Sequence, residues 1–532
     1  MRLAKAALAA LLVLPAVAGP APKLLVVISV DQLSAELIQR WGPELPGGLG
    51  RLYREGCNFL AAYHDHGVTE TGPGHAVLLT GRHPRHTGIV ANQWRDPETG
   101  RFSYCVADPG HTVLGLAPGG AGASARHLAG TTLGGWLHQQ RPGSRIFAVT
   151  GKDRSAILMA GPQAEGVYWF AGPAGFTSST AYTHELPPWL RAYDQRFLAG
   201  LAPADLVWTA LDPGQPPATA SYSIAGRTLT MGLPRTVGAG ALDEGFWERF
   251  CTSPFLDQAI LGAAQALVEG ERLGAGPGLD VLALGLSGTD YVGHAFGNSG
   301  PEMADQLRRL DRSLGQFLAP LLARPGTWVV LSADHGAADF PERRNRQGLP
   351  GQRLDPKDWQ ARLESRLAHS LGGARAYFRP LASCQLSLDP EALAASGHSR
   401  AEILAAARRE CLASPEVEAA FTGEELEQLT PTAVGPDRTS LAERMRLSYL
   451  RGRSGDLVVV FRPFTTLGGG VAGHGSPYDY DRRVPLIFWG PWKPARHGEP
   501  VSVVDLAPTL ARQLGIEPGP GVDGRALELE LD

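Results

Sequence analysis

Short apolar segments alternate with amphipathic segments along most of the chain. The apolar segments are rich in Val, Ile and Leu, and they cover 23–30, 145–151, 279–288, 327–334, 456–461 and 484–490. Runs of this length are typical of strands that are buried on both faces of a sheet. Between them, apolar residues recur at helical spacing, as in 301–323 and 504–514. The alternation predicts an α/β fold with a mostly parallel central sheet and helices on both faces.

Polar residues follow several of the predicted strands directly. Asp31 follows the first strand, Asp290 comes soon after 279–288, and the pair Asp334-His335 ends another. Ligands of open α/β sheets bind at the carboxyl ends of the strands. We therefore expect these side chains to converge in space, although they lie far apart along the chain.

Two long segments, about 155–260 and 338–455, lack the regular alternation of strands and helices. The first is rich in Gly, Pro, Tyr and Trp, and the second contains a helical stretch at 400–412. We interpret both as insertions that form loops or small subdomains at the rim of the site. The prediction is one catalytic domain over 19–532.

The first 18 residues have the pattern of a secretory signal peptide. Arg2 and Lys5 precede an apolar run, and residues 16–18 (AVA) match the cleavage pattern of small residues. A retained membrane anchor is the alternative, but the run is short for a bilayer span. We expect a periplasmic or secreted protein without a membrane span after cleavage.

Composition narrows the possible partners. The formal net charge is -4 and the chain has no basic run, which argues against binding of a nucleic-acid polymer. Five cysteines are present, none of them in a CxxC pair, so cysteine ligation of a metal is not expected. The sequence leaves zero, one or two disulfides open, and it leaves the oligomeric state open.

Aspartate and histidine residues offer the oxygen and nitrogen ligands that zinc prefers. The candidates are Asp31, Asp290 and His294 in DYVGH, Asp334 and His335 in SADHG, and His474 in AGHGS. Each motif alone is weak, since a single Asp at a strand end is usually a helix cap or a turn former. Their joint occurrence favours a site for two metals.

Other histidines are weaker candidates for metal ligands than the residues named above. We expect His64-Asp65-His66 to form a solvated strand edge, because alternate residues of a strand point to opposite faces. We interpret His75, His83 and His86 as local loop packing.

Thr71 precedes a glycine-rich turn and a predicted helix that begins near Ala76. The N-terminus of a helix suits anions and nucleophilic oxygens, although a simple capping role fits Thr71 better on local evidence alone. Lys152 and Arg154 lie two residues apart after a predicted strand, so both could reach one phosphate. The amide of Asn92 could donate to the same group. Taken alone, Lys152 and Arg154 fit an exposed, ion-paired loop better, and Asn92 fits a turn better.

Together the motifs resemble the alkaline phosphatase superfamily, and within it the bacterial, phosphate-irrepressible enzymes that use threonine as the nucleophile. These enzymes are related to type I phosphodiesterase/nucleotide pyrophosphatases. The matching segments follow the family's order: VVISVDQ at 26–32, TGPGHAVLLTG at 71–81, GIVANQW at 88–94, GKDRSAILMAG at 151–161, DYVGHAFG at 290–297, SADHG at 332–336 and GHGSPYDYDRRVPL at 473–486. Gly72 stands where close relatives are expected to have alanine.

The resemblance implies an alkaline-phosphatase-like fold and hydrolysis of small phosphate monoesters through a phosphothreonine intermediate on Thr71. It also implies two zinc ions. The implied ligands of one zinc are Asp290, His294 and His474, and those of the other are Asp31, Asp334, His335 and the Thr71 oxygen. The implied phosphate contacts are Asn92, Lys152 and Arg154. The sequence neither supports nor excludes an additional Ca²⁺ site.

A phosphodiesterase or nucleotide pyrophosphatase on the same two-zinc site is the main alternative. The cations of Lys152 and Arg154 favour the monoester, because its dianion has more charge to bind than a diester. A sulfatase would need the Cys or Ser that opens a C/S-x-P-x-R segment, and 71–75 reads TGPGH instead, with neither Cys nor Arg. A protein that only binds metal or phosphate would not need the nucleophile.

Overall fold

The computed structural model describes most of the chain after the N-terminal segment. The described residues are 22–96, 99–116, 122–201, 205–212, 219–238, 240, 242–372 and 376–532. The predicted signal peptide at 1–18 lies outside them. No helix within these ranges is both long enough and apolar enough to cross a lipid bilayer.

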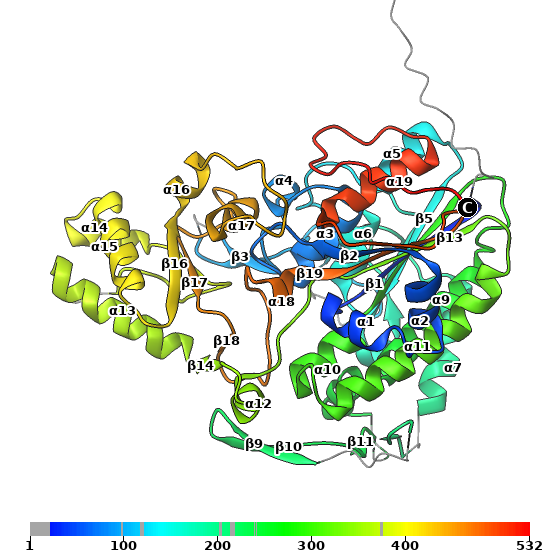
Figure 1. The fold of residues 1–532 in the computed structure, drawn as a ribbon, viewed down its shortest axis with the longest axis horizontal. Helices are drawn as coiled ribbons and strands as arrows, with labels where there is room; N and C mark the ends of the chain where they lie inside the picture. Colours follow the sequence, from blue (N-terminus) through cyan, green and yellow to red (C-terminus); the bar gives the residue numbers. More distant parts are fainter. Residues whose placement is uncertain are drawn as a thin grey trace, which may run out of the picture.

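A ten-stranded mixed sheet forms the centre of the protein (Figure 1). Its strands are β1 (Leu24–Val30), β2 (Cys57–Tyr63), β5 (Arg145–Thr150), β6 (Gly166–Phe170), β7 (Phe176–Thr177), β12 (Asp280–Leu286), β13 (Thr327–Ser332), β19 (Arg483–Trp489), β20 (Ala495–His497) and β21 (Val501–Ser502). Their order is β20-β2-β19-β13-β1-β12-β5-β6-β7, and β21 also pairs with β2. The strands from β13 to β6 run parallel, whereas β19 is antiparallel to both of its neighbours. The predicted α/β fold with a mostly parallel sheet is confirmed.

Helices cover both faces of this sheet, as Figure 1 shows. One face carries α3 (Thr71–Thr80), α5 (Leu133–Gln140), α6 (Asp153–Ala160) and α19 (Leu506–Leu514). The other carries α1 (Ala35–Trp41), α2 (Gly48–Glu55), α7 (Pro188–Leu201), α9 (Phe255–Gly270), α10 (Gly288–Phe296) and α11 (Pro301–Leu322). Because both faces are covered, every position of β1, β12 and β13 is buried. This explains the continuous apolar runs in the sequence.

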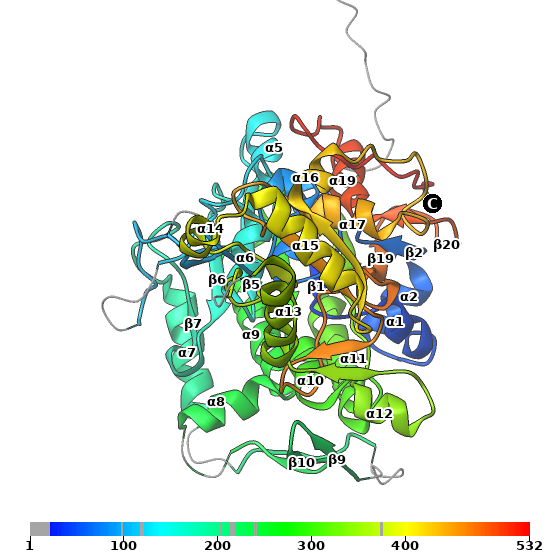
Figure 2. The ribbon, with the colours of Figure 1, turned by 90° about the vertical axis from the view of Figure 1, so that its left-hand side faces the viewer.

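A small lobe lies at the left of Figure 1 and faces the viewer in Figure 2. It consists of the three-stranded sheet β15 (Gln385–Leu386), β17 (Leu457–Phe461) and β16 (Val417–Thr422), together with α13 (Pro356–Leu371), α14 (Pro390–Ser396) and α15 (Arg400–Leu412). The lobe has a hydrophobic core of its own, which includes Trp359, Ile403 and Val459. Most of this lobe lies in the segment that the sequence leaves irregular. The sequence predicts the run at 456–461 as a strand of the central sheet, but it forms β17 and pairs with β15 and β16 instead.

The remaining short elements form the connections around the sheet and the small lobe. They are α4 (Pro84–Thr87), α8 (Glu244–Cys251), α12 (Pro341–Arg346), α16 (Gly423–Gln428), α17 (Leu441–Ser448), α18 (Asp479–Arg482), β3 (Gln93–Arg95), β4 (Phe102–Tyr104), β8 (Val207–Trp208), β9 (Ala220–Ile224), β10 (Arg227–Met231), β11 (Arg235–Thr236), β14 (Gln352–Leu354) and β18 (Thr465–Leu467). Strands β9 and β10 form a hairpin. Its Tyr222 and Met231 pack on Val471 and Ala472, so the hairpin supports the loop that leads to His474.

The prediction of a solvated edge for His64-Asp65-His66 is wrong. His64 and His66 are 1% and 0% exposed. The argument from strand alternation fails because β2 already ends at Tyr63, and the following residues run into the interior. His64 Nε2 donates to the carbonyl of Ala333, and burial lowers the pKa of His64 to about 4.

The structure also answers the question of the disulfides. All five cysteines have free thiols, namely Cys57, Cys105, Cys251, Cys384 and Cys411. Three of these side chains are buried and two are partly buried. The fold is therefore held together without a covalent cross-link.

Candidate active site

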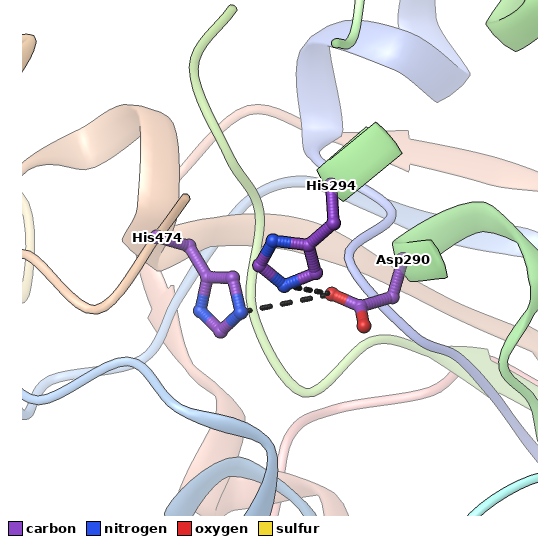
Figure 3. Close-up of side chains that lie close together, drawn as sticks. All are labelled: Asp290, His294 and His474. Atoms are coloured by element: carbon purple, nitrogen blue, oxygen red, sulfur yellow. Dashed lines mark ion pairs between the residues drawn. The ribbon is translucent and has the colours of Figure 1, made fainter. Parts of the chain in front are cut away.

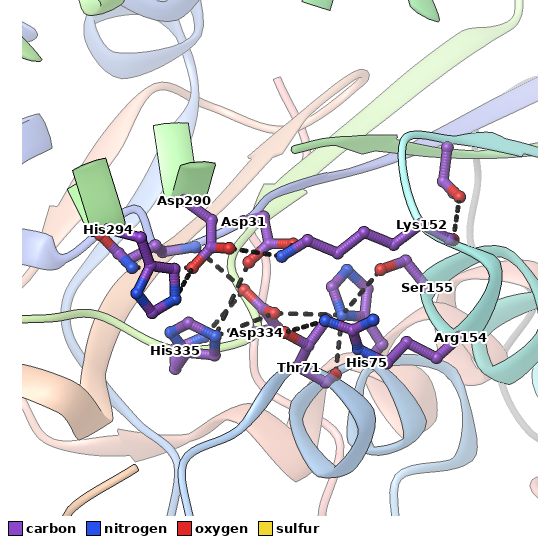
Figure 4. Close-up of polar contacts among 12 residues, drawn as sticks. Asp31, Thr71, His75, Lys152, Arg154, Ser155, Asp290, His294, Asp334 and His335 are labelled. Carbon is purple, nitrogen blue, oxygen red and sulfur yellow. Dashed lines mark hydrogen bonds and ion pairs between the residues drawn. The ribbon is translucent and has the colours of Figure 1, made fainter. Parts of the chain in front are cut away.

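The candidate residues converge at the carboxyl ends of the parallel strands (Figure 4). Asp31 follows β1 directly, Lys152 follows β5, and the Asp334-His335 pair lies just beyond β13. Asp290 lies in the first turn of α10, which begins after β12. Adjacent parallel strands thus bring residues separated by about three hundred positions into one cluster, as the strand-end pattern predicts.

Asp290, His294 and His474 form the first group (Figure 3). Nε2 of His294 lies 3.3 Å and Nε2 of His474 lies 3.6 Å from Oδ1 of Asp290. Nδ1 of His294 donates to the carbonyl of Ala472 at 3.0 Å, and Nδ1 of His474 donates to that of Thr69 at 2.8 Å. Because a carbonyl only accepts, each ring donates from Nδ1, and a ring that gives up its other proton to a metal keeps its lone pair on Nε2. Both Nε2 atoms point toward the carboxylate, and the neutral form of each ring is then the tautomer that a metal requires.

Asp31, Asp334 and His335 lie next to this group and are buried. Nε2 of His335 is 3.6 Å from Asp31 Oδ1 and 3.3 Å from Asp334 Oδ2. His335 also donates from Nδ1 to a carbonyl, that of Gly336 at 3.0 Å. One ligand atom each of Asp31, Asp290 and His335 lies within 4.8 Å of the others, close enough to share one ion. Asp290 therefore stands between the two groups.

Unsatisfied buried atoms show that these residues fit metal ions. Among the described residues, Asp31 Oδ1, Asp334 Oδ2 and His335 Nε2 are buried and form no hydrogen bond. Leaving such atoms without a partner is costly. Two carboxylate oxygens and an imidazole nitrogen are the ligand types that zinc takes. A bound cation would satisfy all three atoms at once.

Lys152 compensates part of the negative charge in this cluster. Its Nζ lies 2.6 Å from Asp31 Oδ2 and 2.5 Å from Asp290 Oδ2. Burial alone would lower the pKa of Lys152, but the two carboxylates outweigh burial and raise it above its usual value. The ammonium thus lies against the carboxylates rather than against Thr71.

The two carboxylates that hold Lys152 differ in their acidity. Burial and the neighbouring Asp334 raise the pKa of Asp31 well above its ordinary value. Burial acts in the same direction on Asp290, but Lys152 and His294 outweigh it and hold the pKa of Asp290 well below the ordinary value. Asp290 is therefore the more firmly ionised of the two.

Thr71 is the first residue of α3 and is buried beside the cluster. The backbone N–H of Gly72 donates to Asn92 Oδ1 at 2.7 Å, which turns the NH₂ group of Asn92 away from this contact. Gly74 allows the helix to come close, because a Cβ at this position would lie 2.1 Å from the carbonyl oxygen of Asp334. The start of α3 is thereby pressed against the Asp334-His335 turn.

Arg154 approaches Thr71 from α6. Its Nη2 donates to Thr71 Oγ1 at 3.3 Å, and its Nη1 donates to the hydroxyl of Tyr104 at 3.3 Å. The Tyr104 hydroxyl in turn donates to Asp153 Oδ1 at 2.6 Å. This chain of contacts holds the guanidinium in place, and Figure 4 shows Arg154 beside Thr71. A guanidinium in that place can bind two oxygens of a phosphoryl group.

Sequence reasoning missed several residues that contact the site. His75 was interpreted as loop packing, yet its Nδ1 lies 3.2 Å from Asp334 Oδ2 and 2.9 Å from the carbonyl of Thr71. Glu70 accepts from the N–H of Asn92 at 2.6 Å, and Gln32 donates to Asp290 and Asp334. One indication for Glu70 and Gln32 was present in the sequence, because Glu70 is next to Thr71 and Gln32 is next to Asp31.

The chain was compared with known families and proteins. The model of the type I phosphodiesterase/nucleotide pyrophosphatase family matches residues 25–472. The chain is 36% identical to the alkaline phosphatase PhoK of a Sphingomonas species, over 96% of this chain and 92% of PhoK. It is 34% identical to the alkaline phosphatase PhoD of Zymomonas mobilis, over 96% of this chain and 88% of PhoD.

Solved structures show the same likeness. The crystal structure of the alkaline phosphatase PafA superposes with a TM-score of 0.84 at 27% identity, over 96% of this chain and 99% of PafA. A PafA mutant in which a threonine, an asparagine, a lysine and an arginine are replaced gives a TM-score of 0.83 at 26% identity, with the same coverage of both chains. The murine ectonucleotide pyrophosphatase/phosphodiesterase 5 shares only the fold, with a TM-score of 0.53 at 13% identity over 93% of this chain and 96% of the murine one.

Proposed function

The chain belongs to the type I phosphodiesterase/nucleotide pyrophosphatase family within the alkaline phosphatase superfamily, and from this premise we propose that it hydrolyses phosphate monoesters through Thr71. The enzyme is an alkaline phosphatase, with relatives of that name matching nearly the whole chain at 34–36% identity. The observation that carries the proposal is the contact of Arg154 with the Thr71 hydroxyl at 3.3 Å, beside the aspartate and histidine cluster.

We propose two zinc ions as the cofactors. Asp290, His294 and His474 would hold one, and Asp31, Asp334, His335 and the Thr71 oxygen would hold the other. Bound there, zinc supplies Lewis-acid chemistry that lowers the pKa of a hydroxyl and stabilises a departing oxygen. The tautomers of the three histidines and the unsatisfied oxygens of the carboxylates support this assignment.

Thr71 acts as the nucleophile in the proposed reaction. Its Oγ1 attacks phosphorus, the new Oγ1–P bond forms, and the bond to the ester oxygen breaks, so that the alcohol departs with a proton. Water then attacks the phosphothreonine, the Oγ1–P bond breaks, and Thr71 is regenerated with release of inorganic phosphate. The position of Thr71 at the start of α3 favours this, because a helix N-terminus stabilises negative charge on the transferring group.

Arg154 and Asn92 bind the phosphoryl oxygens in this proposal. Arg154 is held toward Thr71 by Tyr104, and the NH₂ group of Asn92 is left for an acceptor by the contact of its oxygen with Gly72. Donors fixed in advance stabilise charge that develops in the transition state. Lys152 adds positive charge from the side of Asp31 and Asp290. The four residue types replaced in the PafA mutant occur here in the same order as Thr71, Asn92, Lys152 and Arg154.

Hydrolysis of phosphodiesters is the second candidate, and the family match favours it as a side activity. A diester would have to place its second organic group where the Arg154 guanidinium lies against Tyr104 and Thr71. That position suits a charged oxygen better than an organic group, so the monoester is the preferred substrate.

The phosphothreonine intermediate gives the direct test of the nucleophile. The protein is mixed with a phosphate monoester at alkaline pH, quenched in acid and digested, and the peptides are analysed by mass spectrometry. We expect a phosphate adduct on Thr71, absent from Thr71→Ala, which should also lose turnover by at least about 10³-fold. Full turnover by Thr71→Ala would refute the assignment.

We propose that the enzyme works in the periplasm or outside the cell. The support is the basic and apolar pattern of residues 1–18. Fractionation of cells that express the full chain, followed by N-terminal sequencing of the protein, tests this: an intact Met1 in the cytoplasmic fraction would contradict it.

A further inference from the structure

Gln32, the residue after Asp31, has a backbone conformation that is unusual for a glutamine. Val30, Asp31, Gln32 and Leu33 form a turn in which the N–H of Leu33 donates to the carbonyl of Val30. Gln32, the third residue of this turn, has φ of 68°. Glycine or asparagine normally occupies such a position, because a larger side chain is strained there. A long glutamine at this point suggests that its side chain is needed.

Gln32 contacts both groups of the candidate metal centre. Its backbone N–H donates to Asp334 Oδ1 at 3.1 Å, and its side-chain Nε2 donates to Asp290 Oδ1 at 2.7 Å. The direction of the second bond is fixed, because an ionised carboxylate only accepts. Oδ1 of Asp290 is also the oxygen toward which His294 and His474 point.

The surroundings leave the Gln32 amide little freedom. Gln32 is 1% exposed, and it packs on Gly293, which lies between Asp290 and His294 in α10. A Cβ at position 293 would come 1.8 Å from Oε1 of Gln32. The glycine in the DYVGH segment therefore makes room for the amide, and the fit explains why this position has no side chain.

We propose that Gln32 is a positioning residue whose side-chain amide orients the Asp290 carboxylate for metal binding, while its backbone N–H holds Asp334. This inference rests on the proposed function, since it assumes that Asp290 and Asp334 hold metals. The hydrogen bond from the amide holds Oδ1 of Asp290 in place before an ion arrives. Such a partner of a metal ligand typically contributes about 10- to 100-fold in metal affinity.

The side chain of Gln32 contacts Asp290, and its backbone N–H contacts Asp334. A substitution of Gln32 should therefore weaken the binding of only one of the two zinc ions. Substitution of the side chain removes only the bond to Asp290, while the N–H to Asp334 remains. One of two zinc equivalents should therefore bind more weakly, and the other should bind as in the wild type.

The experiment is a zinc titration of metal-stripped protein against a chromophoric chelator, together with the rise in Tm on adding zinc. Gln32→Met keeps the length of the side chain but has no donor, and Gln32→Gly removes the donor while relieving the positive φ. We expect both variants to bind one equivalent about 10- to 100-fold more weakly and to show a smaller rise in Tm. A role confined to the turn predicts wild-type affinity for Gln32→Gly.

Gln306→Met is the matched control. Gln306 is buried and donates to the carboxylate of Asp257 at 2.7 Å, the same kind of bond at the same length, but Asp257 is not a proposed ligand. This variant should keep wild-type affinity for both equivalents. Unchanged affinity in both Gln32 variants, or an equal loss in Gln306→Met, would overturn the proposal. Failure of the wild-type protein to bind two zinc ions would instead contradict the proposed function.

Discussion

The Arg154 guanidinium lies 3.3 Å from the Thr71 hydroxyl, although the two residues come from different helices, α6 and α3. In the proposed reaction, the contact places a permanent positive charge next to the phosphoryl oxygens during attack by Thr71. Tyr104 and Asp153 hold the guanidinium in this orientation. The arrangement therefore favours substrates with the most negative charge on phosphorus.

Replacement of Arg154 should separate the two classes of ester. Arg154→Ala is expected to lower kcat/KM for a phosphate monoester by about 10²- to 10³-fold, because a fixed donor to the transferring oxygens is lost. The loss for a diester should be at least tenfold smaller. The measurement is steady-state hydrolysis of p-nitrophenyl phosphate and of bis-p-nitrophenyl phosphate by both proteins. Equal losses on the two substrates would rule out charge recognition by Arg154.

Removal of metal should abolish activity. Chelation leaves Asp31, Asp334 and His335 with unsatisfied buried atoms and leaves Thr71 with an ordinary hydroxyl. We expect activity to return when about two equivalents of Zn²⁺ per chain are added. Atomic absorption of the dialysed protein then gives the amount of zinc bound per chain. Restoration by Mn²⁺ or Ca²⁺ but not by Zn²⁺ would contradict the assignment of the metal.

Gly74 should be essential for the position of α3. In Gly74→Ala the new Cβ would collide with the carbonyl of Asp334 at 2.1 Å. We expect a loss of about 1–3 kcal/mol in the free energy of unfolding, together with lower activity, because the helix that carries Thr71 must shift.

Gly200→Ala is the control for this substitution. Gly200 lies in α7, and nothing lies within 4 Å of a Cβ placed there. Alanine in an open helical position stabilises by up to about 1 kcal/mol relative to glycine. Chemical denaturation monitored by circular dichroism, with activity assays, compares the two variants. A neutral Gly74→Ala would show that the close approach is unimportant.

Asp257 should make stability depend on pH. Its carboxylate accepts from the N–H of Gly288 at the start of α10 and from Gln306, and burial raises its pKa from 3.8 to about 6. The folded protein thus binds this proton more tightly than the unfolded chain. The stabilisation is complete below pH 4 and is lost as pH rises through 6, by on the order of 3 kcal/mol.

Asp257→Asn tests this linkage, because asparagine does not titrate. The free energy of unfolding of the wild type, minus that of Asp257→Asn, should fall between about pH 4 and 6.5 and stay flat above it. Urea denaturation of both proteins across this range gives the difference, in which pH effects common to both cancel. A difference that stays constant with pH would show that Asp257 is ionised normally in the folded state.

Five strands of the central sheet (β1, β5, β12, β13 and β19) and most of the candidate site could be predicted from the sequence for a physical reason. The less continuous strands β2 and β6 were missed, and the run at 456–461 forms β17 of the small lobe instead. Buried parallel strands require continuous apolar runs, and ligands of such sheets bind at the strand ends. The positions of Asp31, Asp290 and Asp334 just after the predicted strands therefore identified them as candidates.

The sequence did not show which groups these side chains would contact. Lys152 follows its strand as predicted, but its ammonium lies against Asp31 and Asp290. The electrostatic attraction of two nearby buried carboxylates is stronger than that of more distant groups.

Residues that act on the candidate ligands through hydrogen bonds were harder to predict from the sequence. Gln32 and His75 have no distinctive spacing, and their contacts with Asp290 and Asp334 arise only when β1, α3 and α10 meet. His64 and His66 show the converse error, since a pattern argument for strands was applied to residues past the end of β2.

The central claim is that this site is built for a phosphate monoester. The most direct test compares kcat/KM of the zinc-loaded mature protein for p-nitrophenyl phosphate with that for bis-p-nitrophenyl phosphate at alkaline pH. We expect a preference for the monoester of at least about 10²-fold, because fixed cationic donors lie at the transferring group. A preference for the diester would contradict this claim and would leave Arg154 and Lys152 without the role proposed for them.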